Sequence, residues 1–345
     1  MKSYFRLIAG TALLALTALP ANEARAAGCD ISRPIVFAGL DWDSNAFHTA
    51  VARFVLEKGY GCVTDVIPGS TLPLLTGMAR GDIDVTMEIW EDNITEAWTK
   101  AVAAGQVVGL GVNYPDAVQG WFVPRYVQEG DKERGIAASA PDLRHVNDLP
   151  RYKSLFADPE EPDKGRFYNC ILGWACEVVN TKKLAVYDLA GSYTNFRPGT
   201  GAALAAAIAS NFERGKPFVA YYWGPTWVLG KYDLVMLEEP PYDKATWEKM
   251  GSEDNPDVAT AYPVVEVIVG ANKKFADSAD IVVGFLERYE TDNAMISEAL
   301  AFLQNKPGAT AEDAARNFLE ERDEVWTQWV PGDVADRVMA ALAGS

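Results

Sequence analysis

The stretch RPIVFAGLDWDSNAFHTAVARFVLEKGYGCVTDVIPG, residues 33–69, decides the fold, because its apolar pattern changes period twice. Residues 33–42 form a short apolar run, which is typical of a buried strand. Polar capping residues and closing glycines bound a helical pattern over residues 44–61. A second strand pattern follows at residues 63–69. This order predicts two neighbouring parallel strands joined by a helix.

Outward from this unit, strand and helix patterns keep alternating, which predicts a parallel sheet with helices on both faces. We expect helices over 70–82 and 94–106, and strands over 83–90, 107–112 and 120–126. A second alternating unit has strand patterns at 166–172, 190–197 and 217–223, with helices starting near 175 and 199. The strand pattern at 262–270 leads back to the first unit and to C-terminal helices.

The chain is therefore expected to be an α/β protein of two lobes with two crossings between them. We expect a signal peptide over 1–26, lobe I over 27–117 plus 224–345, and lobe II over 118–223. A cleft beside the crossings is the place where a ligand is expected to bind.

The N-terminus has the pattern of a cleaved secretory signal. Lys2 and Arg6 precede the apolar run 7–19, and Ala24 and Ala26 form a cleavage site. The run is too short to span a membrane, so we expect a mature protein in the periplasm. An alternative is a lipoprotein with lipid attached to Cys29.

The overall charge limits the possible partners. The chain has 49% hydrophobic and 23% charged residues, with a net charge of −17. This composition is typical of a globular protein with a sizeable core. Such an acidic surface disfavours nucleic acid and anionic membranes, and it weakly favours a cationic ligand.

The chain has four cysteines, an even number that in an oxidising compartment predicts two disulfides. Cys29 and Cys62 precede the two neighbouring strands, so we expect them to pair at one sheet edge. Cys170 and Cys176 are close in sequence and are expected to close a loop around Trp174. Redox or metal roles remain alternatives, although only two histidines are present and no metal or cofactor is expected.

Several tryptophans lie where parallel strands end, which is where open α/β sheets bind ligands. Trp42, Trp90 and Trp223 close strand patterns, Trp174 lies in the loop between the two cysteines, and Trp121 begins another strand. Grouped indole faces attract an onium cation, each face contributing roughly 0.5–2 kcal/mol. A sugar is the alternative ligand for stacked aromatic rings.

The chain resembles the substrate-binding proteins of ABC importers for glycine betaine, proline betaine and choline. The matching residues are Cys170, Trp174 and Cys176, together with EIWEDN (88–93), GWFVPRYV (120–127) and YYWGPTWVLGKYDLVMLEEP (221–240). The resemblance implies a type II periplasmic-binding-protein fold that closes on its ligand and then meets an inner-membrane permease. We expect a monomer.

The resemblance also implies a site. Its aromatic box is Trp90, Trp174 and Trp223, completed by Trp42 or Trp121. In this family a ligand carboxylate takes backbone N–H groups, which correspond here to Ala175 and Cys176 at a helix start.

One departure concerns the ligand's other end. A histidine that often helps to bind the carboxylate is replaced by Ile94, and Glu88 lies near the expected cage. This carboxylate favours a cation without a carboxylate, such as choline or protonated trimethylamine oxide; dimethylsulfoniopropionate also fits. Further acids near the strand ends are Asp41, Asp43, Glu91 and Glu177, each of which is alternatively a solvated loop residue or a helix cap.

A secreted hydrolase acting on a small cationic substrate is the alternative of another class. The sequence contains no G-x-S-x-G, H-E-x-x-H or G-x-x-x-x-G-K-[ST] motif. The segment FRPGTGAA (196–203) weakly resembles a phosphate loop, but a helix N-cap explains it equally. We therefore expect a binding protein and not an enzyme.

Overall fold

The computed structural model describes residues 28–344, so the signal peptide expected over 1–26 lies outside the described residues. The chain forms one mixed α/β sheet of nine strands, in the order β2-β1-β3-β9-β4-β7-β5-β6, with β8 paired to β4. The α/β class expected from the sequence is thus confirmed. Among residues 28–344 no helix is both long and apolar enough to cross a membrane.

The three strands within residues 33–90 form where the apolar pattern predicts them. The strands of the whole sheet are β1 (Ile35–Leu40), β2 (Thr64–Gly69), β3 (Val85–Ile89), β4 (Val107–Pro124), β5 (Gly165–Tyr168), β6 (Tyr193–Phe196), β7 (Val219–Gly224), β8 (Leu234–Met236) and β9 (Val265–Asn272). β1 lies parallel to β2 and β3, whereas β9 is antiparallel to β3 and β4. Every residue of β3 and β7 is buried, as expected for strands covered on both faces.

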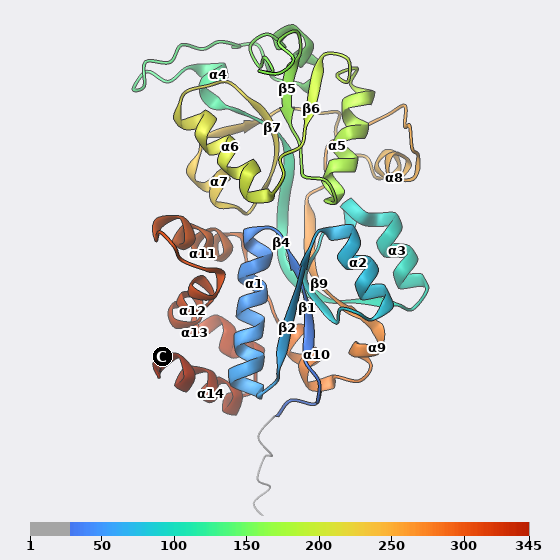
Figure 1. Ribbon diagram of the computed structural model, residues 1–345, viewed down its shortest axis with the longest axis vertical. Helices are drawn as coiled ribbons and strands as arrows, with labels where there is room; N and C mark the ends of the chain where they lie inside the picture. Colours follow the sequence, from blue (N-terminus) through green and yellow to red (C-terminus); the bar gives the residue numbers. More distant parts are fainter. Residues whose placement is uncertain (1–27, 345) are drawn as a thin grey trace, which may run out of the picture.

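Helices cover both faces of the sheet (Figure 1). The N-terminal helices are α1 (Asp43–Phe54), continued by the π-helix η1 (Val55–Tyr60), α2 (Thr71–Arg80), η2 (Glu91–Ile94), α3 (Thr95–Ala103) and α4 (Arg125–Glu129). The middle helices are η3 (Val146–Tyr152), α5 (Ala175–Val186), α6 (Gly201–Glu213), α7 (Trp227–Lys231) and α8 (Lys244–Ser252). The C-terminal helices are α9 (Lys273–Ala276), α10 (Asp280–Leu286), α11 (Asn293–Asn305), α12 (Ala311–Glu321), α13 (Asp323–Trp326), η4 (Thr327–Trp329) and α14 (Gly332–Ala343).

β4 is a single strand, although the sequence predicts two strands at 107–112 and 120–126. Its first part pairs with β9, and from Val118 onward it pairs with β7 instead. Register shifts interrupt the β9 pairing, and Asp116 has a φ of 59°. These irregularities bend the strand without ending it, so β4 runs from one part of the molecule into the other (Figure 1).

We propose that the two parts are lobes, with β1–β3 and the C-terminal helices in lobe I and β5–β8 in lobe II. β8 pairs with Phe122–Pro124 of β4, beside β7. On this proposal the chain stays in lobe II beyond residue 224, the boundary predicted from the sequence. This pairing favours a return to lobe I near residue 264, just before β9.

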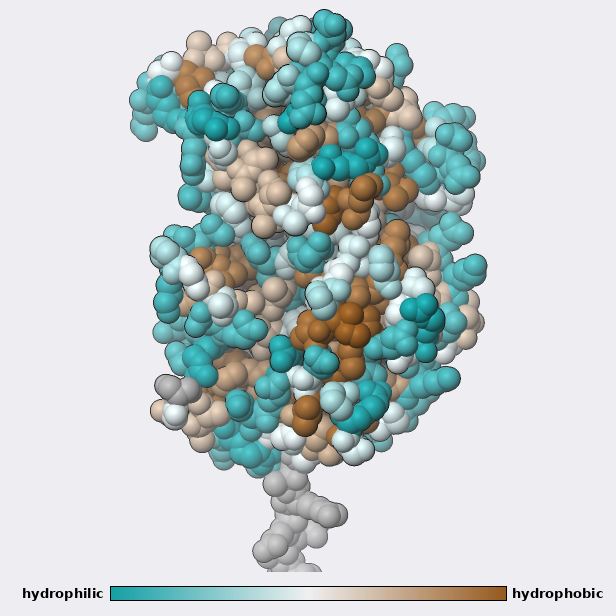
Figure 2. Space-filling view, viewed as in Figure 1, coloured by the Kyte–Doolittle hydropathy of each residue, from teal (hydrophilic) through white to brown (hydrophobic). Residues whose placement is uncertain are grey.

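Both expected disulfides are present. Cys29 and Cys62 are joined with their Cα atoms 5.1 Å apart, and Cys170 and Cys176 with theirs 6.0 Å apart. The sulfur of Cys29 is bonded to Cys62 and is therefore not free for lipid attachment. On the face shown in Figure 2, apolar patches lie along the middle of the molecule, the largest on the lower part and a smaller one on the upper part near the junction.

Candidate functional site

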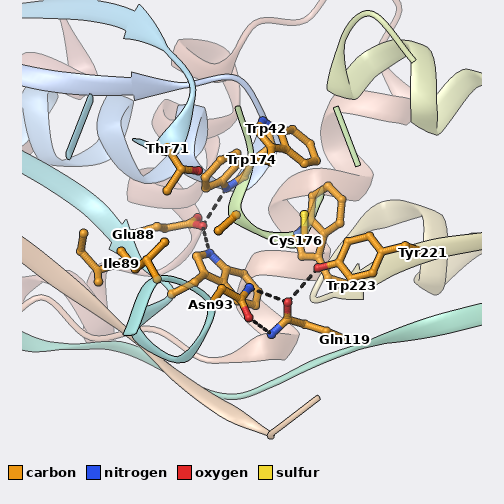
Figure 3. A pocket seen from close by; sticks show the side chains of 13 residues that line it. Trp42, Thr71, Glu88, Ile89, Asn93, Gln119, Trp174, Cys176, Tyr221 and Trp223 are labelled. Carbon is orange, nitrogen blue, oxygen red and sulfur yellow. Dashed lines mark hydrogen bonds between the residues drawn. The ribbon is translucent and has the colours of Figure 1, made fainter. Parts of the chain in front are cut away.

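A cavity lies between the two lobes, where strands β1, β3 and β7 end. It encloses about 480 Å³ of space free of protein atoms, part of it open to solvent. Figure 3 shows its side chains. The lining residues are Trp42, Thr71, Glu88, Ile89, Trp90, Asn93, Ile94, Gln119, Trp174, Ala175, Cys176, Tyr221 and Trp223.

Four tryptophans from separate segments form the aromatic part of the wall. Trp42 follows β1, Trp90 directly follows β3, Trp174 precedes α5 and Trp223 lies at the end of β7. The ring of Trp174 meets Trp42 edge-on, with centroids 5.4 Å apart, and meets Trp223 edge-on at 5.2 Å. Because these rings stand nearly perpendicular, their faces border one space from different sides. The four strand-end and loop tryptophans singled out in the sequence are therefore brought together.

The loop that carries Trp174 is tightly held. The Cys170–Cys176 disulfide closes it, and Gly173 turns the chain with a φ of 94°. A side chain is disfavoured at such a φ, so glycine suits this turn. Trp174 is only 3% exposed and donates its indole N–H to Asp41 Oδ1 at 2.6 Å. Ala175 and Cys176 begin α5 and line the cavity, which points the positive end of the helix dipole toward it.

Glu88 supports two of the tryptophans from one oxygen. Its Oε2 accepts the indole N–H of Trp42 at 2.7 Å and that of Trp90 at 3.1 Å (Figure 3). Its Oε1 is buried and has no hydrogen bond of normal geometry, although the Ser44 and Tyr114 hydroxyls lie nearby. Burial raises the pKa of Glu88, and the surrounding donors only partly offset that effect.

A chain of neutral polar groups forms another part of the wall. Asn93 Nδ2 donates to Gln119 Oε1 at 2.7 Å, and the Tyr221 hydroxyl donates to the same oxygen at 2.7 Å. These three residues come from η2, β4 and β7, so this row of hydrogen-bonded groups spans both lobes. Their place in the site could not be predicted from the sequence, because isolated polar residues within or just after strands form no recognisable motif.

Trp121 does not line the cavity, in contrast to its expected place in the aromatic box. It is fully buried in lobe II, 4.3 Å from the ring of Phe167, and it donates to Asn180 Oδ1 at 2.7 Å. Side chains alternate along β4, and this one points into the core.

The other acidic candidates lie outside the lining. Glu177 pairs with Arg197 at 2.6 Å in the first turn of α5, as its helix-cap alternative suggested. Asp43 accepts the indole N–H of Trp227 at 3.1 Å. Glu91 begins η2, and its pKa is raised by partial burial.

The lining residues include a carboxyl group and no cationic side chain. Glu88 is the one acidic side chain among the lining residues, and no lysine, arginine or histidine belongs to that set. His48 lies behind the wall beside Tyr289 and, because burial lowers its pKa to about 3, it is neutral. Within residues 28–344 no group of three or more His, Cys, Asp or Glu side chains is placed to hold a metal ion. The wall is thus suited to a small cation with apolar substituents.

Residues 33–321 match the family described as the substrate binding domain of ABC-type glycine betaine transport system. The chain belongs to this family. Its members are substrate-binding proteins, and the fold of this binding protein is that of type II periplasmic binding proteins. The expected resemblance and fold type are confirmed.

Individual relatives of this binding protein differ in the ligand that their names state. It is 22% identical to a trimethylamine N-oxide-binding protein of Pelagibacter ubique, over 86% of this chain and 91% of the relative. It is 29% identical to a glycine betaine/proline betaine-binding periplasmic protein of Escherichia coli, over 59% of each chain.

Solved structures share the fold at low identity. A choline-binding protein in complex with choline has a TM-score of 0.71 at 19% identity, covering 91% of this chain and 98% of the other. A glycine betaine, L-proline-binding protein from Borrelia burgdorferi has a TM-score of 0.70 at 18% identity, covering 89% of this chain and all of the other.

Proposed function

We propose that the protein binds a small onium compound in the cage of Trp42, Trp90, Trp174 and Trp223. The observation that carries this proposal is the perpendicular packing of Trp174 between Trp42 and Trp223, which leaves indole faces around one space. An onium group is attracted to each face and loses little hydration on entering. Three or four such contacts account for micromolar affinity.

Within the onium group, we propose that ligands without a carboxylate, choline and trimethylamine N-oxide, bind more tightly than betaines. Glu88 places a buried carboxyl in the wall, no cationic side chain lines it, and the apolar Ile94 belongs to the same wall. The backbone N–H groups in the first turn of α5 and the side-chain N–H of Gln119 can still donate hydrogen bonds to the oxygen of an N-oxide or hydroxyl. The Pelagibacter relative, aligned over most of both chains, favours trimethylamine N-oxide as one of these.

The bound ligand is then presented, in the periplasm, to an ABC permease. Family membership and the periplasmic relatives support this role. Leu72 and Val178 are exposed on opposite sides of a groove across the cleft, and such apolar side chains suit contact with another protein. The protein does no chemistry on the ligand, in contrast to the hydrolase alternative.

Calorimetry tests the proposal with glycine betaine, proline betaine, choline, carnitine, trimethylamine N-oxide, dimethylsulfoniopropionate and a neutral sugar. We expect saturable binding of choline or trimethylamine N-oxide and recovery of the ligand unchanged. Binding of the sugar alone, or a turnover product, contradicts the proposal. If a betaine binds most tightly, the result supports the cage, but the proposed preference for ligands without a carboxylate is wrong.

Substitutions test which tryptophans form the binding site. Trp174→Ala and Trp223→Ala are expected to weaken binding at least tenfold, whereas the Phe variants keep part of it because a phenyl face attracts cations less strongly. Trp326→Phe is the matched control, since this tryptophan is buried near the C-terminus, where its N–H bonds Leu319 O. Unchanged affinity in both Ala variants contradicts the cage.

A further inference from the structure

The segment Asp41–Asp43, which leads from β1 into the first residue of α1, contacts both lobes. Asp41 Oδ1 accepts the indole N–H of Trp174 at 2.6 Å, and Asp43 Oδ2 accepts that of Trp227 at 3.1 Å. Trp174 precedes α5 and Trp227 begins α7, so both donors come from the lobe II side. Trp42, between the two acids, directs its own N–H to Glu88 within lobe I. The side chains of Asp41 and Asp43 thus both reach across the cleft.

These two carboxylates are held by the indoles and not by cations. No ion pair found among residues 28–344 involves Asp41 or Asp43. A hydrogen bond to a charged acceptor is stronger than one between neutral groups. Both acids keep an exposed edge, so water can replace the indoles when the lobes part. Such bonds can form and break as the cleft closes and opens.

The backbone of lobe II comes very close to this segment. A Cβ placed on Gly201, the first residue of α6, would lie 2.8 Å from the Asp41 carbonyl oxygen and 2.9 Å from the Trp174 ring. The absence of a side chain at Gly201 is therefore a condition for this closed contact. α7 also packs against α11 of lobe I, beside Trp227.

We propose that Asp41 and Asp43 form a latch between the lobes and act as positioning residues that raise the affinity for the ligand. The inference rests on the proposed onium site, because Trp174 is at once a cage wall and a latch donor. Closing the lobes and completing the cage are then one event. Trp227 lies outside the cage lining, so its effect on affinity reports the latch alone.

The test uses the whole mature protein, with choline and trimethylamine N-oxide as probes. Asp41→Ala, Asp43→Ala and Trp227→Phe are each expected to weaken binding about three- to tenfold, mainly through faster dissociation. Asp65→Ala is the matched control, because it removes a lobe I carboxylate that bonds only its neighbour Val66 N. The double variant of Asp43 and Trp227 should lose no more than either single variant. Additive losses, or affinities within twofold of the unmodified protein, overturn the latch.

A second variant separates closure from folding. Gly201→Ala fits a helix start and should leave the melting temperature without ligand unchanged or higher, yet it should weaken binding at least tenfold by blocking the closed contact. Gly199→Ala, with nothing within 4 Å of its added Cβ, is its control. Equal affinity in both glycine variants overturns the latch.

X-ray scattering without ligand gives an independent outcome. We expect the Asp41→Ala, Asp43→Ala double variant to have a larger radius of gyration than the unmodified protein, and equal radii contradict the latch. If the unmodified protein binds no onium probe, the proposed function fails, and the scattering comparison still decides the latch.

Discussion

Glu88 shows how one residue can serve binding at a cost to stability. A buried carboxylate without a cation is expensive, because the protein replaces its hydration incompletely. Here two indole N–H groups share Oε2, while Oε1 has no hydrogen bond of normal geometry. Such an arrangement in the core is best explained by what it does for the cage: it fixes two rings and makes their surroundings negative.

Glu88→Gln is expected to weaken choline binding about tenfold, or about 1.4 kcal/mol. The amide oxygen can still accept both indole bonds, so the rings stay in place while the negative charge is lost. Calorimetry measures the loss, and Glu129→Gln, on the exposed surface of lobe II, is the control. Equal loss for choline and for trimethylamine N-oxide, which has no net charge at neutral pH, would contradict a charge effect.

The same variant predicts a pH dependence of stability. Because burial raises the pKa of Glu88 above its ordinary 4.5, the folded protein holds this proton more tightly than the unfolded chain does. The Glu88 contribution to stability is therefore full below pH 4.5, and it is lost as pH rises through the raised pKa. Chemical denaturation from pH 4 to pH 8 should show Glu88→Gln gaining stability relative to the unmodified protein. A constant difference across this range contradicts the prediction.

Among the structural elements, the two disulfides are expected to have different consequences. Cys29–Cys62 spans 33 residues and joins the start of the chain to the end of η1, far from the cage. Cys170–Cys176 spans only 6 residues and surrounds Trp174. In the loop-entropy estimate the long bridge contributes about 4 kcal/mol to stability and the short one about 2 kcal/mol.

Replacing each cysteine pair by serine tests whether the two disulfides differ in this way. We expect the Cys29→Ser, Cys62→Ser protein to lose more stability but keep its affinity, and the Cys170→Ser, Cys176→Ser protein to lose less stability but bind several-fold more weakly. The reason is that a freed loop must order Trp174 during binding. Urea denaturation and calorimetry provide the two measurements. Unchanged affinity in the second protein would reduce the short bridge to a stabilising role.

Most elements were predictable because their apolar patterns are local. The strands and helices of residues 33–106 follow the expected alternation closely. The continuity of the long strand β4 was not predictable, because it depends on pairing with β9 and then with β7, which lie far away in sequence. The predicted lobe boundary at residue 224 differs from the one proposed near residue 264 for the same reason, since the proposal depends on the pairing of β8 with β4.

The residues of the candidate site likewise fall into those that a local sequence pattern indicates and those that it does not. Trp42, Trp90 and Trp223 were found because strand ends meet at one sheet edge. Trp121 was misplaced, because the face on which it lies depends on the register and bend of β4. The polar chain through Asn93, Gln119 and Tyr221 exists only after the lobes meet, so no local pattern could indicate it.

At the scale of the whole molecule, the crossings place the cage where the two lobes meet. β4 and the segment leading into β9 connect the lobes, so a change in their bend alters the cleft while each half of the sheet stays intact. The tryptophans come from both sides, with Trp42 and Trp90 in lobe I and Trp174 and Trp223 in lobe II. If the proposed lobes part, each holds only half of the cage, so we expect the affinity to depend on closure.

The net charge of −17 gives the last prediction, because a strongly acidic protein attracts cations over a distance. This attraction speeds the arrival of a cation, and salt screens it, with a Debye length of about 10 Å at 0.1 M. We expect choline association to slow about three- to tenfold between low and high salt. Trimethylamine N-oxide, which has no net charge at neutral pH, should change less than about twofold. Stopped-flow tryptophan fluorescence measures both rates on the same protein. If both ligands slow equally, salt acts on lobe closure and not on the approach of the cation.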